Sequence, residues 1–322
     1  MPDTPEGVSP ACDHAAVDVE SHLSTLRGER FYFLPNYGNA GDSLIALATY
    51  QMFHRLGLNW QRLDPARARK ANARGLEGKT LVYGGGGGLT PDYDHGSDPL
   101  NLQAERLKRV IILPHTIVGQ ETLLQRLGSR ATIFCREART LAHVQARAPQ
   151  SEVLAAHDLG LSLNVKDARR EPHTSEVLTA WMHNRLTRRG TPGMRANQRR
   201  LKAALAVSMP KGTTCTRKLF CFRTDKEQPE GTLPENNIDL SVVYGYHVAP
   251  EAAARMSVSA LLRHIDAFQE VHTNRLHVAI AAGLLGKQVF MSGNNYFKNR
   301  AVFEFSLRDR FPNLQWEDAP LG

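Results

Sequence analysis

The chain has 322 residues, of which 42% are hydrophobic and 22% are charged, a composition that indicates a folded globular protein and excludes a disordered chain or a fibre. Chains of this length usually divide into two domains. The formal net charge of +8 favours an anionic partner without distinguishing among nucleic acid, a phosphorylated metabolite and an acidic membrane surface.

The cysteines and the apolar runs indicate where in the cell the protein is located. The four cysteines form no C-x-x-C pair and have no metal-ligand spacing, so we expect reduced thiols and no zinc site. The N-terminus lacks a basic start followed by an apolar segment, and no apolar run is long enough to span a bilayer. We therefore expect a cytoplasmic protein that is neither exported nor membrane-spanning.

Short apolar runs alternate with helical patterns through the first half of the chain. The runs that predict strands are 30–34, 80–84, 109–113, 131–135 and 151–155. Between them the apolar spacing changes to the helical period, as at Leu44, Leu47 and Met52. This alternation predicts an α/β fold with a parallel sheet covered on both faces.

A charged segment interrupted by Pro and Gly divides the chain, and a second α/β unit follows it. The predicted division is an N-terminal extension, a first domain, a basic linker or insert and a second domain, at 1–28, 29–165, 166–214 and 215–322. Strands resume at 218–222, 238–244, 268–271 and 287–291. Two such units leave a cleft between the carboxyl ends of their strands, where open α/β sheets bind ligands.

The stretch 36–45 follows the first predicted strand. Gly38 and Gly41 allow a tight turn, and Asp42 or Ser43 can cap the next helix, which leaves N–H groups open to an anion. A plain capped turn explains the stretch equally well. The pattern is not the dinucleotide-binding G-x-G-x-x-G.

Five consecutive glycines, 84–88, follow the second predicted strand. Because glycine costs about 0.5–1 kcal/mol relative to alanine in regular structure, the run suits a loop in which the backbone closely approaches a ligand or another backbone, and we favour a ligand-facing loop. A flexible loop is the alternative. Asp92 and Asp94 further on match the D-x-D of many metal-dependent glycosyltransferases, but three-residue matches arise by chance, and we expect no metal site.

Ionisable residues recur where predicted strands end. Arg136 follows the strand 131–135, where its planar guanidinium suits a carboxylate or phosphate, with solvation or pairing to Glu137 as the alternative. His157 and Asp158 follow another strand end. These positions predict an anion site at one edge of the sheet.

The stretch 272–290 predicts an amphipathic helix that leads into a buried strand, with Arg275 and His277 in the first turn. A cation at a helix N-terminus is unfavourable by a few tenths of a kcal/mol unless an anion lies nearby. The pair therefore favours an anionic ligand. A structural histidine at a polar helix start is the alternative.

Eight motifs in order resemble those of the polysaccharide pyruvyltransferases, and T-N-R-L-H is the most specific of them. They are G-N-A-G-D (38–42), G-G-G-G-G-L (84–89), L-P-H-T-I (113–117), C-R-E-A-R-T (135–140), H-D-L-G-L (157–161), C-F-R-T-D (221–225), T-N-R-L-H-V-A-I-A-A-G-L-L-G-K (273–287) and N-N-Y-F-K-N (294–299). The resemblance covers roughly residues 30–300. The basic segment 185–217 has no counterpart in it.

The resemblance implies two Rossmann-like domains in an arrangement similar to the GT-B glycosyltransferases. It also implies transfer of pyruvate from phosphoenolpyruvate to two sugar hydroxyls as a cyclic ketal. By similarity, four residues are expected around phosphoenolpyruvate: Arg136, Arg275, Leu276 and His277. Further substrate-binding candidates in the matching motifs are Asn274, Asn39, Asp42, Gly85, Gly86, Gly87, His115, Arg223 and Lys298.

The chemistry of such a transfer suits these residue types. Phosphoenolpyruvate carries a carboxylate and a phosphate, which Arg136, Arg275 and a helix N-terminus can hold while stabilising the leaving charge. His277 is the candidate for proton transfer to C3 or from the attacking hydroxyl. No cofactor is expected besides phosphoenolpyruvate as co-substrate.

The acceptor is expected to be a polysaccharide or a lipid-linked oligosaccharide at the inner membrane face, taken by the N-terminal half. Segment 185–217 would lie against anionic lipid or a pyrophosphate carrier, or be a solvated loop. A nucleotide-sugar glycosyltransferase is the alternative function. Nucleic acid is a poor candidate as a partner of the basic segment. The only aromatic residues that could stack on bases, Trp181 and Phe220, lie at the margins of that segment. The oligomeric state is not indicated.

Overall fold

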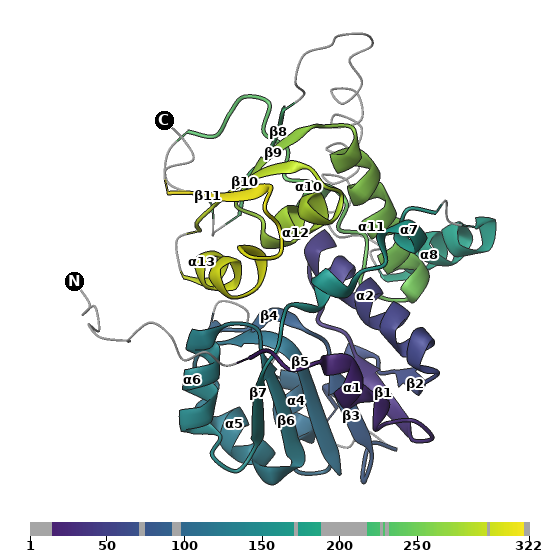
Figure 1. Cartoon of the computed structure of the whole chain (residues 1–322). Helices are drawn as coiled ribbons and strands as arrows, with labels where there is room; N and C mark the ends of the chain where they lie inside the picture. The colour runs from purple at the N-terminus through teal and green to yellow at the C-terminus, as the bar shows by residue number, and fades with distance from the viewer. Residues whose placement is uncertain are drawn as a thin grey trace.

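Two parallel β-sheets, flanked by helices, form the protein (Figure 1). The computed structural model describes residues 15–70, 75–91, 98–170, 173–187, 218–225, 228, 232–294 and 297–318. Most of the predicted N-terminal extension, the D-x-D aspartates and all but the first three residues of the basic segment 185–217 lie outside these ranges. An α/β fold with parallel, Rossmann-like sheets is confirmed, whereas the two-domain, GT-B-like arrangement stays a prediction.

The first sheet has the strand order β2-β1-β3-β5-β6-β7, and β4 pairs with β5 beyond β3. Its strands are β1 (Arg30–Leu34), β2 (Asn59–Arg62), β3 (Thr80–Tyr83), β4 (Gly86–Leu89), β5 (Arg109–Ile117), β6 (Ala131–Cys135) and β7 (Glu152–Ala155). Its helices are α1 (Val19–Ser24), α2 (Ala40–Leu56), α3 (Pro65–Ala68), α4 (Asp98–Gln103), α5 (Glu121–Leu127) and α6 (Ala138–Arg147). Every residue of β3 and β6 is buried, which explains their continuous apolar runs.

The second sheet has the strand order β11-β10-β9-β8, again parallel. Its strands are β8 (Lys218–Cys221), β9 (Glu270–Thr273), β10 (Gln288–Ser292) and β11 (Leu314–Glu317). The helices of this half are α7 (Val165–Ala168), α8 (Thr174–Thr187), α10 (Leu240–Val243), α11 (Glu251–Asp266), α12 (Leu276–Leu284) and α13 (Lys298–Val302). Short helical turns are η2 (Gly128–Arg130), η3 (Leu159–Ser162) and η4 (Phe303–Leu307).

Three sequence predictions need correction. The apolar run 238–244, predicted as a strand, contains the helix α10, because a run this short does not distinguish a strand from a buried helix turn. The glycine run 84–88 is predicted as a loop, but its last three residues belong to β4. The helix α12, predicted as amphipathic, is buried on nearly all sides.

Helix α2 lies between the two sheets and packs against α11 (Figure 1). One hydrophobic core therefore spans both halves: it includes Phe33 and Leu47 from the first and Leu261 and Ile280 from the second. A second core fills the opposite face of the first sheet. Among the described helices, none has both the length and the apolar character needed to cross a bilayer.

A truncation in the shared core tests how far the two halves depend on each other. Leu261 is fully buried in α11, so Leu261→Ala is expected to lower the free energy of unfolding by about 2–5 kcal/mol. Leu178→Ala is the matched control, because that side chain is 54% exposed and its loss should cost under about 0.5 kcal/mol. Urea denaturation followed by circular dichroism measures both. Two separate transitions, with only one shifted by Leu261→Ala, would contradict a shared core.

Candidate active site

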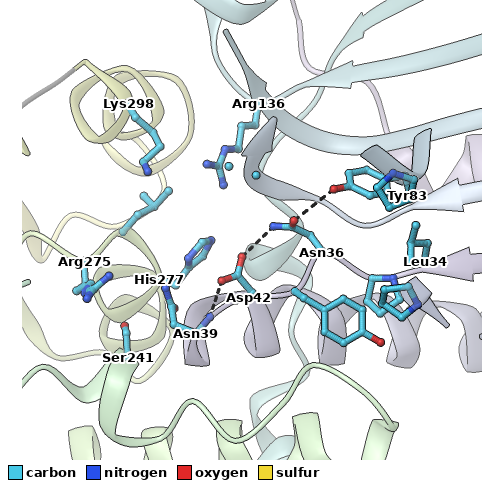
Figure 2. A pocket seen from close by; sticks show the side chains of 18 of the residues that line it. Leu34, Asn36, Asn39, Asp42, Tyr83, Arg136, Ser241, Arg275, His277 and Lys298 are labelled. Atoms are coloured by element: carbon cyan, nitrogen blue, oxygen red, sulfur yellow. Dashed lines mark hydrogen bonds between the residues drawn. The ribbon is translucent and has the colours of Figure 1, made fainter. Parts of the chain in front are cut away.

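A cavity of about 310 Å³ lies where the carboxyl ends of strands from both sheets meet the first turns of α2 and α12. Figure 2 shows the side chains of Arg136, Lys298 and His277 directed toward the same space. Polar and charged residues from both halves line it: Asn36, Asn39, Asp42, Arg69, Arg136, Arg223, Ser241, Arg275, His277, Lys298 and Asn299. The excess of guanidinium and ammonium groups makes the cavity suited to an anion.

The start of α2 forms one wall of the cavity. Asn39, rather than the predicted Asp42 or Ser43, is the N-cap: its Oδ1 accepts from the Gly41 N–H at 2.8 Å. Asp42 completes a capping box by accepting from the Asn39 N–H at 2.8 Å, and its other oxygen accepts from Asn36 Nδ2 at 3.0 Å. Asn39 and Asp42 thus shape the wall through local hydrogen bonds as well as lining it.

The glycines of the run 84–88 serve mainly close packing. A Cβ on Gly85 would lie 2.8 Å from the carbonyl oxygen of Pro114, and a Cβ on Gly86 would lie 2.7 Å from Asn36 Nδ2. Gly86 also has a φ of +136°, a backbone conformation that residues other than glycine rarely adopt. Gly87 lines the cavity, whereas Gly85 and Gly86, predicted to bind substrate, do not.

His115 lies beneath the glycine strand instead of in the cavity. Its Nε2 accepts from the Gly88 N–H at 3.0 Å, and its Nδ1 donates to the Gly84 carbonyl at 3.1 Å. Burial lowers the pKa of His115 to about 3, and the nearby Arg136 guanidinium acts in the same direction. A neutral His115 therefore fixes the glycine backbone, and it is not among the residues that line the cavity.

Arg136 and Asp158 form a buried ion pair beside the cavity. Arg136 Nη1 donates to Asp158 Oδ2 at 2.7 Å, and its Nε donates to Thr116 Oγ1 at 2.9 Å. Asp158 Oδ1 accepts from the Gly160 N–H at 2.8 Å. Burial alone would raise the pKa of Asp158, but His277 and Arg136 together hold it well below its usual range. The carboxylate is therefore ionised at any working pH.

Arg275 is the N-cap of α12 and is held by two carboxylates. Its Nε donates to Asp239 Oδ1 at 3.0 Å, its Nη2 donates to the other oxygen of Asp239, and the same nitrogen lies 3.0 Å from Asp225 Oδ2. Burial opposes the charge, yet Asp239 and Asp225 raise the pKa of Arg275. The anion expected at this helix start is thus supplied in part by the chain itself. Arg275 Nη1 is buried without a hydrogen-bond partner.

His277 stands in the first turn of α12, between Asp158 and the start of α2. Its Nε2 lies 3.5 Å from Asp158 Oδ2, longer than an ordinary hydrogen bond, and has no closer partner. On the other side of the ring, a Cβ on Gly41 would lie 2.5 Å from Nδ1. Glycine at position 41 therefore provides the space that the imidazole occupies.

The structure brings most of the predicted residues together. Those that line the cavity are Arg136, Arg275, His277, Leu276, Asn39, Asp42, Gly87, Arg223 and Lys298. Asn274 is fully buried behind Arg275, and its Oδ1 accepts from the Arg223 N–H at 2.8 Å. Sequence reasoning gave no role to Asp239 or Asn299, although Asn299 ends the motif N-N-Y-F-K-N and lines the cavity.

A family model described as polysaccharide pyruvyl transferase matches residues 39–296, which include most of the residues that line the cavity. The chain belongs to the polysaccharide pyruvyl transferase family. This family membership supports a transferase that acts on polysaccharide and does not favour the glycosyltransferase alternative.

One solved structure similar to this polysaccharide pyruvyl transferase family member is that of a functionally uncharacterised protein from Klebsiella pneumoniae subsp. pneumoniae NTUH-K2044. The two chains share 26% identity and superpose with a TM-score of 0.69, over 93% of this chain and 97% of the other. No curated protein is significantly similar to the chain.

The buried, neutral His115 should make stability depend on pH. Its folded-state pKa of about 3 lies below the unfolded value, so only the unfolded chain takes up this proton as the pH falls. The contribution of His115 to the free energy of unfolding is complete above about pH 6.5 and is lost toward pH 3. Between pH 7 and pH 5 the loss amounts to about 2 kcal/mol. Denaturation at both pH values should show a smaller difference for His115→Gln than for the wild type. An equal difference would contradict this role.

Proposed function

We propose that the protein transfers pyruvate from phosphoenolpyruvate to two hydroxyls of a sugar in a polysaccharide or lipid-linked oligosaccharide. The products are a cyclic pyruvate ketal and phosphate. Family membership supports the reaction class. The observation that carries the proposal is one cavity in which cationic side chains from both sheets surround a histidine.

The charge of the cavity suits phosphoenolpyruvate, which carries a carboxylate and a phosphate. Arg136 and Lys298 approach from opposite halves: a Cβ on Gly87 would lie 3.1 Å from Arg136 Nη2 and 3.7 Å from Lys298 Nζ. Arg275 adds an unpartnered Nη1 beside the start of α12, whose first N–H groups also favour an anion. Such groups bind the ground state and stabilise the charge on the departing phosphate.

The reaction balances with one proton delivered and two removed. Protonation of C3 makes C2 electrophilic, and one sugar hydroxyl attacks C2 and loses its proton. The C2–O bond to phosphate then breaks, the second hydroxyl closes the ring, and its proton leaves with hydrogen phosphate. The site therefore needs one group that exchanges protons near neutral pH.

His277 is the group we assign to proton transfer, with Asp158 as its positioning residue. Asp158 faces Nε2 of the ring at 3.5 Å and is itself fixed by Arg136 and Gly160. A carboxylate in this position orients the imidazole and favours the N–H on Nε2. Nδ1, on the side of α2, is then the nitrogen that exchanges a proton with the substrate.

The acceptor side of the cavity is proposed to be the wall formed by the first half of the chain. Asn36, Tyr37 and Asp42 line it, and Tyr37 is 39% exposed at this position. An aromatic ring and amide groups suit a sugar, which presents both apolar faces and hydroxyls. Contact with an anionic membrane surface through segment 185–217 is part of the same proposal, as is the absence of a cofactor besides phosphoenolpyruvate.

Loss of the histidine tests the assignment. His277→Ala should lower the rate of phosphate release from phosphoenolpyruvate by about 10²–10⁴-fold, the usual contribution of a general acid or base. The assay uses purified protein and a panel of saccharide acceptors. His54→Ala is the control, because that side chain is 60% exposed on α2, and it should keep the wild-type rate.

The same assay decides between functions. Full activity of His277→Ala would remove the proton-transfer role, and phosphate release without any acceptor would remove the transfer reaction. Thermal stabilisation by UDP- or GDP-sugars, and not by phosphoenolpyruvate, would point to the glycosyltransferase.

The space at position 41 can be tested independently. Gly41→Ala would place a methyl group against the His277 ring and displace it, so kcat should fall at least about tenfold. If this loss acts through His277, the double variant Gly41→Ala/His277→Ala should be no slower than His277→Ala alone. Multiplied losses in the double variant would mean that Gly41 acts on something else.

A further inference from the structure

Asn299, at the start of α13, has an amide whose orientation is fixed. Its Nδ2 donates to the Asn274 carbonyl at 2.6 Å, to Asn294 Oδ1 at 2.7 Å and to the Ser292 carbonyl at 3.3 Å. All three partners are acceptors, and two of them are main-chain carbonyl oxygens, which cannot donate. The other end of the amide, Oδ1, is therefore the end that faces elsewhere, as an acceptor.

That oxygen has no hydrogen-bond partner, although the residue lines the cavity and is only 1% exposed. A buried acceptor without a donor is rare in folded proteins and destabilises them. In the same hydrogen-bonded group, Asn274 is 0% exposed, its Oδ1 is used by the Arg223 N–H, and its Nδ2 also lacks a partner. An unused acceptor and an unused donor thus belong to two residues joined by the hydrogen bond from Asn299 Nδ2 to the Asn274 carbonyl.

The unused acceptor has a different chemistry from the rest of this wall. Arg275 and Lys298 next to it are cationic and offer only donors to a ligand. The carboxylate and ionised phosphate of phosphoenolpyruvate are acceptors, so they suit those cations and are repelled by an amide oxygen. A hydroxyl can donate to Asn299 Oδ1 while it accepts from another group.

We propose that Asn299 binds a hydroxyl of the acceptor sugar through Oδ1, and that this hydroxyl is one that does not react. An amide oxygen is too weak a base to take a proton, so the hydroxyl it holds keeps its own. The assignment rests on the proposed function. On this assignment the second half of the chain, which supplies cations for phosphoenolpyruvate, also contacts the acceptor sugar. Asn299 then contributes to selection among sugars.

Monodeoxy sugars test this assignment. Methyl glycosides of glucose, galactose and mannose are assayed for phosphate release with phosphoenolpyruvate, and the best is compared with its monodeoxy analogues that keep the reacting hydroxyl pair. For the wild type, one analogue should show kcat/KM lowered about 5- to 10-fold, the worth of one neutral hydrogen bond. The Asn299→Ala variant should have the same kcat/KM for that analogue and for its parent glycoside, and its KM for phosphoenolpyruvate should change little.

A second variant guards against loss of folding. Asn299→Ser removes the amide oxygen but keeps a small polar side chain, so it should show the same loss of discrimination, and circular dichroism checks the folding of both variants. The assignment is overturned if a folded variant still distinguishes the parent glycoside from its analogue, or if the wild type has the same kcat/KM for every analogue. It is also overturned if a variant raises the KM for phosphoenolpyruvate as much as the KM for the glycoside. If neither the glycosides nor any acceptor of the saccharide panel supports phosphate release, the proposed function itself is overturned.

Discussion

The carboxylate of Asp158 is the point on which the rest of the site depends. A single oxygen of it lies 2.7 Å from Arg136, which follows a strand of the first sheet, and 3.5 Å from His277, which belongs to a helix of the second. Both residues of the ion pair are almost fully buried, and removal of one partner of such a pair typically costs about 3–5 kcal/mol. Arg136 and Asp158 both follow strands of the first sheet, so it is the 3.5 Å contact between Asp158 and His277 that depends on how the two sheets are placed relative to each other.

Helix α2 holds the two sheets in that placement. Its body packs against α11 within a hydrophobic core common to both sheets, while its first turn lines the cavity. Gly41 in this turn leaves room for the His277 ring. On the opposite wall, Asp239 and Asp225 fix the Arg275 guanidinium before any ligand binds. Charges held in place in this way need little rearrangement during a reaction, which is the main source of electrostatic catalysis.

The sequence was sufficient for the parts of the structure that follow from local pattern. The buried strand predicted at 131–135 is β6, and the rule that polar residues at strand ends share one edge brought Arg136, Arg275 and His277 to a common cavity. His115 was a candidate only through the motif L-P-H-T-I, and a motif match does not reveal which way a side chain points: this imidazole bonds to the main chain of Gly84 and Gly88 and does not line the cavity. The pairing of His277 with Asp158 joins residues far apart in the chain, so no local pattern predicts it.

The most direct test of the account is a crystal structure of the protein soaked with phosphoenolpyruvate. We expect density for phosphoenolpyruvate in the cavity, with Arg136 and Arg275 both within hydrogen-bond distance of its carboxylate or phosphate, and with His277 beside the C3 methylene. Density elsewhere on the protein, or guanidinium groups that still contact only Asp158, Asp225 and Asp239, would contradict it.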